Sequence, residues 1–438
     1  MNIELYTLIH KLYLSALSKL VALTEEYNNA MMDEATVDII TMEKALMSNK
    51  LVNANMTAPL KRINDILNGD PSACLEELIV LLDNISEDLT LSIAQHIAGE
   101  IDKIPHLDKE VTDILFDYFD LIGLELKEIQ QLAFRVCERA SYTNPMRSYE
   151  FSLKILTANP DFLGEPQMHH PGYVFRHTEQ RTFDRCLICG GNGVPYYRSF
   201  PYVTPNGTLP HLPVKLWMRC ECCGNYYAYQ FPEEYLALCE NKELLMPDSS
   251  KYIISTQEVY GELLPKWCNT LKSLQRFTDG KDLLEVGIGN GALLAVALEL
   301  GYNADAVEIT PKQAQYVSNM LNIPIWNCDF LRFTSDKKYS VITMGDVIEH
   351  VTDPEMALRK AHELLADDGV LWISTPNFKS SFSLLRKFKD VMWSIANHIT
   401  YFSYDGMKAL AEKCGFKVVD YKVSDHYNGS MELILVKS

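Results

Sequence analysis

The spacing of apolar residues predicts helices over the first third of the chain. Across residues 1–165, apolar positions recur at intervals of three and four, as in the stripe Ile9, Leu12, Ala16 and Leu20. This spacing places apolar side chains on one face of a helix, and no alternating run of strand length interrupts it. We therefore predict an all-helical module over residues 1–165.

The helical period is lost from about residue 166, where prolines, glycines and aromatic residues become more frequent. Two Cys-x-x-Cys-Gly motifs lie in this stretch, one beginning at Cys186 and one at Cys220. We predict a separate small module over residues 166–250.

Short apolar runs alternate with helical patterns in the last part of the chain. Val341–Met344 and Gly369–Ser374 are typical of buried strands, and Pro354–Leu365 between them is typical of a helix that begins with proline. This alternation predicts a doubly wound α/β domain over residues 251–438. The other predicted elements are a helix over Ser403–Lys413 and two closing strands, Phe416–Tyr421 and Met431–Val436.

A glycine-rich turn is the strongest functional signal in this domain. The apolar run Leu283–Val286 leads into Gly287, Gly289 and Gly291, and a helical pattern follows directly. A strand, a glycine turn and a helix in this order let a ligand come close to the backbone. Glu308, 19 residues after Gly289, is placed to accept hydrogen bonds from a ribose diol. The sequence therefore predicts a nucleoside site.

Two kinds of nucleoside ligand fit this turn. A dinucleotide would suit the glycine spacing, because the run also reads as Gly-x-Gly-x-x-Ala. S-adenosylmethionine is favoured by Glu285 in the strand end and by Asp329, which follows the short apolar strand Ile323–Cys328 and can accept from an adenine amino group. The run Asp346-Val-Ile-Glu-His-Val-x-Asp-Pro favours it further.

On these motifs, Tyr252–Ser438 resembles the class I S-adenosylmethionine-dependent methyltransferases, in the branch that methylates small molecules. The resemblance implies a seven-stranded sheet whose last strand is antiparallel. It implies S-adenosylmethionine as the cofactor, with seven binding residues: Glu285, Gly287, Gly289, Gly291, Glu308, Asp329 and Asp346.

The two cysteine motifs predict a structural metal site in a zinc-ribbon-like module. Cys186, Cys189, Cys220 and Cys223 supply four sulfur ligands, which suit a closed tetrahedral zinc site. The glycine after each motif can turn backbone amides toward the thiolates. Disulfides and an iron–sulfur cluster are the alternatives, and Cys222 is a possible replacement for Cys223.

The charge distribution bears on the partners. The net charge is −18, and residues 1–165 contribute about −14 of it. Proteins bind nucleic acid through clustered positive charge, so we do not expect this acidic chain to bind nucleic acid. In the simplest interpretation, the acidic side chains keep the surfaces of these helices solvated. The alternative roles of the helical module are to pair two subunits, to cap the active site or to dock a partner. The absence of a signal peptide and of a long apolar run predicts a cytoplasmic location.

Two histidines follow strands at the carboxyl edge of the predicted sheet. His398, just before the predicted helix Ser403–Lys413, is the first candidate for the base that accepts a proton from the methyl acceptor. Small-molecule methyltransferases of this branch often have a histidine at that place. His350 is the second candidate, with a hydrogen bond at a helix entry as its alternative role.

A stretch between strand and helix, Phe378–Ala396, predicts either an amphipathic helix with a solvated basic face or a lid that recognises an anionic acceptor. Its basic residues are Lys379, Arg386, Lys387 and Lys389.

The function predicted from these features is methyl transfer from S-adenosylmethionine to a small molecule. A four-cysteine module before a methyltransferase domain also resembles two groups: sugar C-methyltransferases that act on nucleotide-linked deoxysugars, and ribosomal RNA methyltransferases with an N-terminal zinc module. A sugar or nucleotide-linked sugar is therefore the expected acceptor. An RNA methyltransferase and a non-catalytic cofactor-binding module are the alternatives.

Overall fold

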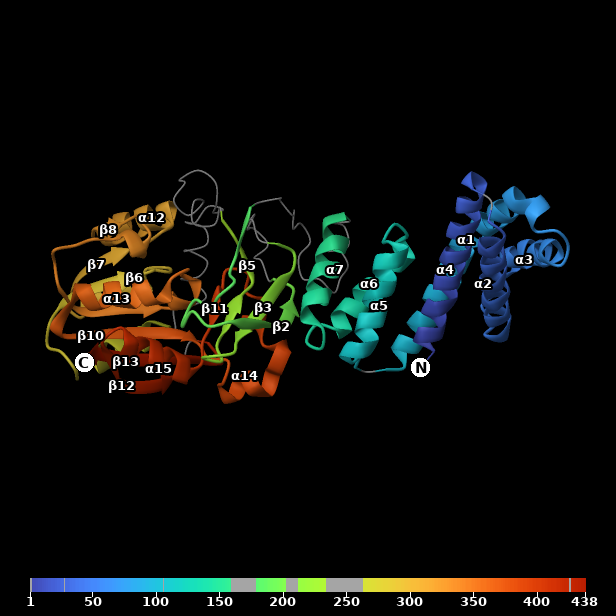
Figure 1. Cartoon of the computed structure of the whole chain (residues 1–438). Helices are drawn as coiled ribbons and strands as arrows, with labels where there is room; N and C mark the ends of the chain where they lie inside the picture. The colour runs from blue at the N-terminus through green and yellow to red at the C-terminus, as the bar shows by residue number, and fades with distance from the viewer. Residues whose placement is uncertain are drawn as a thin grey trace. The chain divides into compact units, whose positions relative to one another are not determined.

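The computed structural model of the chain describes residues 2–26, 28–104, 106–158, 179–201, 212–233, 263–424 and 427–438 (Figure 1). The chain divides into two compact units, Met1–Ile155 and Leu156–Ser438. The module boundaries predicted at residues 165 and 250 both lie outside the described residues.

The N-terminal unit is helical wherever it is described, as the apolar spacing predicts. Ile9, Ala16 and Leu20 of the predicted stripe are completely buried. Several helices begin at a side-chain cap; Asn53, for example, accepts hydrogen bonds from the amides of Asn55 and Met56. The helices are α1 (Ile3–Glu25), α2 (Asn29–Ser48), α3 (Ala54–Leu67), α4 (Leu75–Asp102), α5 (Lys109–Ile122), α6 (Lys127–Arg139) and α7 (Pro145–Ala158), with the 3₁₀ turn η1 (Ser72–Cys74).

A bilayer-crossing helix would need a long apolar stretch, and none of the helices in the described part of the chain has one.

The C-terminal unit is built on a seven-stranded sheet of order β12-β13-β10-β9-β6-β7-β8. Its strands are β6 (Asp282–Val286), β7 (Asn303–Val307), β8 (Ile325–Trp326), β9 (Tyr339–Gly345), β10 (Leu365–Pro376), β12 (Phe416–Val423) and β13 (Ser430–Lys437). The pairs from β10 to β8 are parallel, and β13 runs antiparallel to both of its neighbours. The predicted doubly wound fold with an antiparallel last strand is therefore confirmed.

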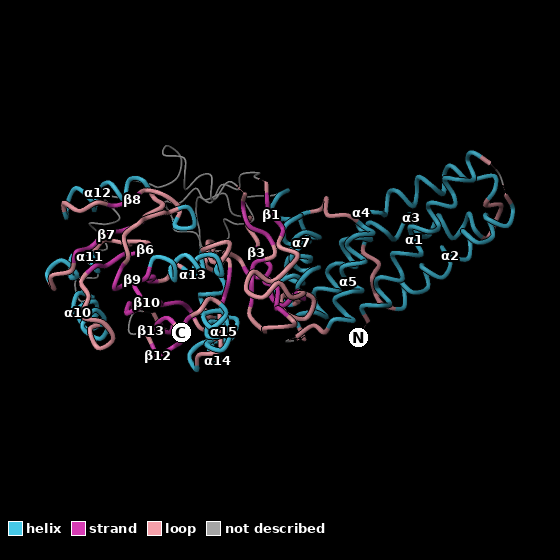
Figure 2. Tube along the Cα trace, turned by 60° about the vertical axis from the view of Figure 1, so that its left-hand side comes forward, coloured by secondary structure: helices cyan, strands magenta, loops and turns pink. Residues whose placement is uncertain are grey.

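Helices cover both faces of this sheet. Figure 2 shows α10 and α11 on one side and α13 and α15 on the other. One side is closed by an apolar cluster that includes Leu271, Leu294, Val317 and Trp372. The helices are α10 (Leu263–Leu274), α11 (Ala292–Glu299), α12 (Pro311–Leu321), α13 (Pro354–Leu364) and α15 (Tyr404–Lys413).

The cysteine motifs lie on a second sheet in the same unit. Its order is β11-β4-β3-β2, and β1 (Gln180–Thr182) pairs separately with β5 (Gln230–Pro232). Its strands are β2 (Gly193–Ser199), β3 (Lys215–Cys220), β4 (Tyr226–Ala228) and β11 (Thr400–Tyr401). Strand β11 lies between β10 and β12 of the seven-stranded sheet in the sequence, whereas β2, β3 and β4 come from the region of the cysteine motifs. The second sheet therefore combines strands from both regions.

The stretch Phe378–Ala396 corrects one prediction, since it is not a single amphipathic helix. It breaks into α14 (Ser381–Arg386) and the 3₁₀ turns η5 (Lys387–Lys389) and η6 (Val391–Ser394). Lys387 ends α14 with a left-handed φ of 51°, and the Asp390 side chain caps η6 by accepting from the amide of Met392. These two features mark the points where the helical spacing of the apolar residues is not followed.

Candidate functional site

The glycine turn follows β6 as the sequence predicts. Gly287, Gly289 and Gly291 all have left-handed φ angles, at 73°, 51° and 79°. A Cβ on Gly287 would lie 2.7 Å from a Val347 methyl, whereas a Cβ on Gly289 would meet no atom of the described residues within 4 Å. The turn therefore requires glycine for its conformation and leaves open space in front of Gly289, where a ligand can approach the backbone.

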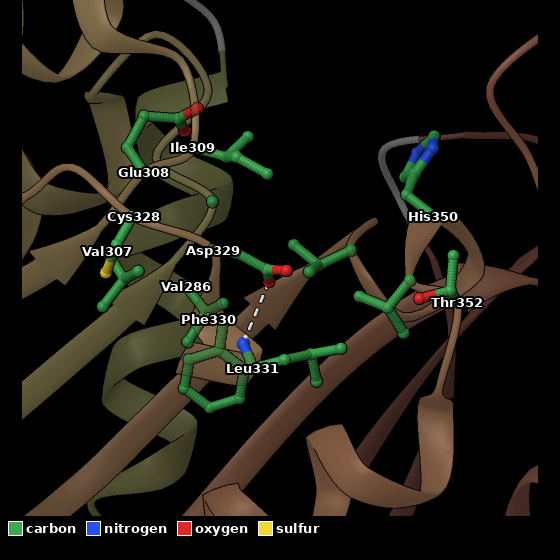
Figure 3. Close-up of a pocket in the computed structure, with 13 residues that line it drawn as sticks. Val286, Val307, Glu308, Ile309, Cys328, Asp329, Phe330, Leu331, His350 and Thr352 are labelled. Carbon is green, nitrogen blue, oxygen red and sulfur yellow. Dashed lines mark hydrogen bonds between the residues drawn. The ribbon is translucent and has the colours of Figure 1, made fainter. Parts of the chain in front are cut away.

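A pocket of about 620 Å³, its open mouth included, lies at the carboxyl ends of β6 and β7. Glu308 and Asp329 lie on one side of it and His350 on the other (Figure 3). Its lining residues are Val286, Gly287, Val307, Glu308, Ile309, Cys328, Asp329, Phe330, Leu331, Val347, His350, Val351 and Thr352. The size and mixed lining suit a nucleoside-sized ligand.

The predicted cofactor residues divide between this pocket and its surroundings. Gly287, Glu308 and Asp329 line it. The other four, Glu285, Gly289, Gly291 and Asp346, are not among its lining residues. The apolar walls come from the ends of β6 and β7 and from the segments that follow β7, β8 and β9, and no local pattern in the sequence predicts them.

Glu308, at the end of β7, ties the glycine turn to the next loop. Its carboxylate accepts from the amide of Ile288 at 3.1 Å and from the amide of Thr310 at 2.7 Å. Burial raises its pKa, while these amides act in the opposite direction. Each carboxylate oxygen has a second lone pair, so Glu308 can still accept from a ligand hydroxyl.

Glu285 is a buried carboxyl with capacity for a ligand. Only 6% of it is exposed, and its Oε2 has no hydrogen-bond partner among the described residues. Burial, and then the nearby charge of Glu308, raise its pKa well above the usual value. An unpaired buried carboxyl oxygen is costly, so a donor group or positive charge on a ligand would stabilise this position.

Asp329 and Asp346 have different surroundings. One oxygen of Asp329 accepts from the amide of Leu331 at 3.0 Å and caps the 3₁₀ turn η3 (Phe330–Arg332), as drawn in Figure 3. Asp346 follows β9 with a left-handed φ of 52°, and its amide donates to Ser374. Burial raises the pKa of Asp346 to about 6. A strained, buried carboxyl of this kind is typical of a functional loop.

Beside the pocket, Glu349, His350 and His398 form a cluster of potential ligand atoms that all lie within 4.8 Å of one another. The two imidazole centroids are 4.8 Å apart. His350 Nδ1 hydrogen-bonds the carbonyl of Asn397 at 2.9 Å, and Thr375 donates to Glu349 Oε2 at 3.0 Å. The sequence predicted both histidines but not their meeting with Glu349, which sits in the 3₁₀ turn η4 (Ile348–His350).

Burial controls the ionisation of this cluster. It lowers the pKa of His350 to about 4 and that of His398 well below the usual value. Burial, and then the charge of Asp346, raise the pKa of Glu349. Both imidazoles are therefore neutral at neutral pH, and each has a nitrogen lone pair to offer.

Lys215, on β3 of the second sheet, holds the loop that carries His398. Its ammonium donates to the carbonyls of Ile395 at 3.0 Å and Ala396 at 3.3 Å, and to the carbonyl of His398. It is only 6% exposed, and burial lowers its pKa. Trp217 on the same strand donates to the carbonyl of Trp393 at 2.8 Å. The cysteine-bearing sheet thus supports the loop that carries His398. This support was not predicted from the sequence.

The four predicted metal ligands also come together. Sulfurs of Cys186, Cys189, Cys220 and Cys223 lie within 4.8 Å of one another, with 3.6 Å between Cys186 and Cys223 and 3.4 Å between Cys189 and Cys220. Tetrahedral zinc with bonds of about 2.3 Å requires similar separations of about 3.8 Å. Cys222 is exposed and does not belong to the cluster.

Backbone and side-chain donors surround these sulfurs. The amides of Ile188 and Cys223 point at Cys186 and Cys220, each at 3.4 Å. Asn225 Nδ2 donates to Cys223 at 3.4 Å, while its Oδ1 accepts from the amide of Ser403 at 2.8 Å. Such donors stabilise thiolates, so the site fits a metal ion, and Asn225 links it to the start of α15.

Comparison with known proteins points to a methyltransferase domain in the C-terminal unit. The family described as a methyltransferase domain matches residues 261–421. A ubiquinone biosynthesis O-methyltransferase of Glaesserella parasuis serovar 5 is 35% identical over 111 residues, which are 22% of this chain and 46% of that protein. An (S)-tetrahydroprotoberberine N-methyltransferase of Eschscholzia californica is 24% identical over 177 residues, 37% of this chain and 49% of that protein. The chain thus spans about half the length of these curated relatives.

Among solved structures, an S-adenosylmethionine-dependent methyltransferase of Clostridium acetobutylicum ATCC 824 aligns with 43% of this chain and 98% of its own, at 10% identity and a TM-score of 0.35.

Proposed function

We propose that this chain, whose residues 261–421 belong to the class I S-adenosylmethionine-dependent methyltransferases, transfers a methyl group to a hydroxyl of a small molecule. The observation that carries the proposal is the arrangement of the glycine turn, Glu308 and Asp329 around one pocket, with His350 on its far side. The similarity to an O-methyltransferase at 35% identity supports oxygen as the acceptor atom.

The cofactor would be held by the residues that surround the turn. Glu308 would accept from the ribose hydroxyls, Asp329 from the adenine amino group, and the free oxygen of Glu285 would face positive charge. When bound, S-adenosylmethionine supplies an electrophilic methyl carbon, whose bond to sulfur breaks with its electron pair left on sulfur as the acceptor oxygen forms the new bond.

The acceptor would lie on the histidine side of the pocket. That His398 accepts the hydroxyl proton, with His350 as the second choice, remains a prediction that rests on position. A sugar or nucleotide-linked sugar is our preferred acceptor, and the pairing of a four-cysteine module with a methyltransferase domain is what supports it. The exposed basic residues Arg386, Lys387 and Lys389 nearby in sequence would suit an anionic group.

A binding measurement tests the cofactor assignment. By calorimetry, the protein should bind S-adenosylmethionine, and Glu308→Ala should weaken binding by about 1.5–3 kcal/mol because a charged hydrogen bond is lost. Glu299→Ala, an exposed acid at the end of α11, serves as the matched control and should leave affinity unchanged. Equal affinity in wild type and Glu308→Ala would remove Glu308 from the site. Preferential binding of NAD would overturn the whole assignment.

We also propose that the four clustered thiolates bind one structural zinc ion. The tetrahedral arrangement leaves no open position for a substrate, which argues for a role in folding rather than in catalysis. The link from Cys223 through Asn225 to Ser403 would let the metal centre stabilise the neighbouring domain.

Elemental analysis of protein purified without chelators should find one zinc ion per chain. Cys189→Ser should lose the metal and lower the melting temperature, because metal binding contributes directly to folding. Cys222→Ser is the matched control: this cysteine is exposed, lies outside the cluster and should retain the zinc. Finding iron, or full zinc in Cys189→Ser, would contradict the assignment.

A further inference from the structure

The cluster of Glu349, His350 and His398 contains two buried polar atoms that the protein leaves unsatisfied. Glu349 is 1% exposed and His398 is 4% exposed. Neither Glu349 Oε1 nor His398 Nδ1 has a hydrogen-bond partner in the described part of the chain. Burying such an atom without a partner is energetically unfavourable, so a role in packing alone does not account for them.

The remaining contacts of the cluster orient its side chains. His350 Nδ1 hydrogen-bonds the carbonyl of Asn397, so Nε2 is the ring nitrogen that a ligand would use. Nδ1 of His398 has no hydrogen-bond partner among the described residues, so this nitrogen is available to a ligand. Glu349 uses one oxygen on Thr375 and keeps the other. Histidine ligands in metal sites are oriented in this way, with one ring nitrogen on a backbone carbonyl and the other on the metal.

We infer that Glu349, His350 and His398 together bind a divalent cation, whose open coordination positions take the hydroxyl oxygen of the acceptor. Two ligands of a cation with bonds of about 2.0–2.2 Å lie at most about 4.4 Å apart. The present ligand atoms lie within 4.8 Å, so a small side-chain movement would bring them into range. Asp346, whose charge acts on Glu349, adds negative charge at the site.

The ligand set defines the class of metal and its chemistry. Two imidazoles and one carboxylate suit first-row divalent ions such as Mn²⁺, Fe²⁺ and Zn²⁺, and three protein ligands leave positions open. A hydroxyl bound to such an ion loses its proton more readily, and that proton passes to water. The cation would then replace direct proton transfer to an imidazole. The role toward the acceptor rests on the proposed function, whereas cation binding does not.

Manganese binding to the full-length protein with its cysteine site loaded tests the inference. Electron paramagnetic resonance distinguishes free from bound Mn²⁺ during a titration with MnCl₂. Mn²⁺ is chosen because thiolate sites, such as the four-cysteine cluster, bind it weakly. Wild type should show one saturable site per chain, and Glu349→Gln and His350→Asn should each weaken it about tenfold or more. His362→Asn and Glu363→Gln, a His-Glu pair on α13 outside the cluster, are the matched controls and should bind as wild type does.

Absence of a saturable site in wild type, or equal binding in all four variants, would overturn the inference. The wild-type titration decides the question even if one variant fails to fold. Calorimetry with S-adenosylmethionine on the same samples keeps the two proposals apart. Manganese binding without cofactor binding would leave this site standing and refute the proposed function, and the reverse result would refute only the cation site.

Discussion

Replacement of His398 by alanine should lower turnover by about 10²–10⁴-fold, the usual loss when a group that acts on the acceptor proton is removed. His398 is 4% exposed, lies beside His350 and is not among the lining residues of the cofactor pocket. Its loss should therefore change the affinity for S-adenosylmethionine little. Turnover is measured as release of S-adenosylhomocysteine once an acceptor has been found by screening nucleotide-linked sugars.

His362→Ala is the control for this variant, because His362 is a partly buried histidine of the same domain outside the cluster. It should retain near-normal turnover. If His398→Ala stayed active while His350→Ala was crippled, the order of the two histidines would be reversed. Normal turnover in both variants would exclude a catalytic role for the cluster, whether as a base or as a cation site.

The main fold of the C-terminal domain could be predicted because its signals are local. Strand β9 is a run of apolar residues, and the helix after it begins at Pro354, with Asp353 as its cap. The three glycines with positive φ are visible as letters in the sequence. Each of these signals acts within a few residues, so the sequence carries it directly.

The short elements between β10 and α15 could not be predicted in the same way. Apolar residues at helical spacing favour one helix over Phe378–Ala396, but a left-handed Lys387 ends it after six residues. The buried side chains of Met392 and Trp393 pack instead into an aromatic cluster with Trp217 of the other sheet. Tertiary packing therefore decided the conformation here.

In the candidate site too, residues with a local sequence signal were predicted, whereas contacts between distant segments were not. Glu308 and Asp329 were predicted because each follows a strand whose end lies at one edge of the sheet. Glu349 meets His398 only because the loop before β11 folds back onto η4, where the amide of Ile399 donates to the carbonyl of Glu349 at 2.7 Å. The support from Lys215 spans about 180 residues of sequence. Contacts between residues so far apart in the sequence cannot be predicted from a local sequence pattern.

Lys215→Met should lower turnover while leaving cofactor affinity nearly unchanged, because the hydrogen bonds of Lys215 go to the loop of His398. Methionine has a similar length but removes the ammonium, which lies 4.2 Å from the centre of the Trp217 ring. The carbonyls of Ala396 and His398 then lose the donor that Lys215 provides, and the carbonyl of Ile395 keeps only the amide of His398. Each unsatisfied carbonyl costs about 1–3 kcal/mol, which the loop can relieve by moving toward water. A displacement of about 1 Å at the reacting groups can cost about 10²-fold in rate.

The measurement compares kcat, the affinity for S-adenosylmethionine and the melting temperature in the same samples. Lys338→Met is the matched control, since this exposed lysine also donates to a carbonyl, that of Glu363, but far from the histidine loop in sequence. A merely structural role for Lys215 predicts a lower melting temperature with normal kcat in the folded fraction. A positioning role predicts a reduced kcat there, with partial rescue in Lys215→Arg, because an arginine retains donors for the carbonyls of Ile395 and His398.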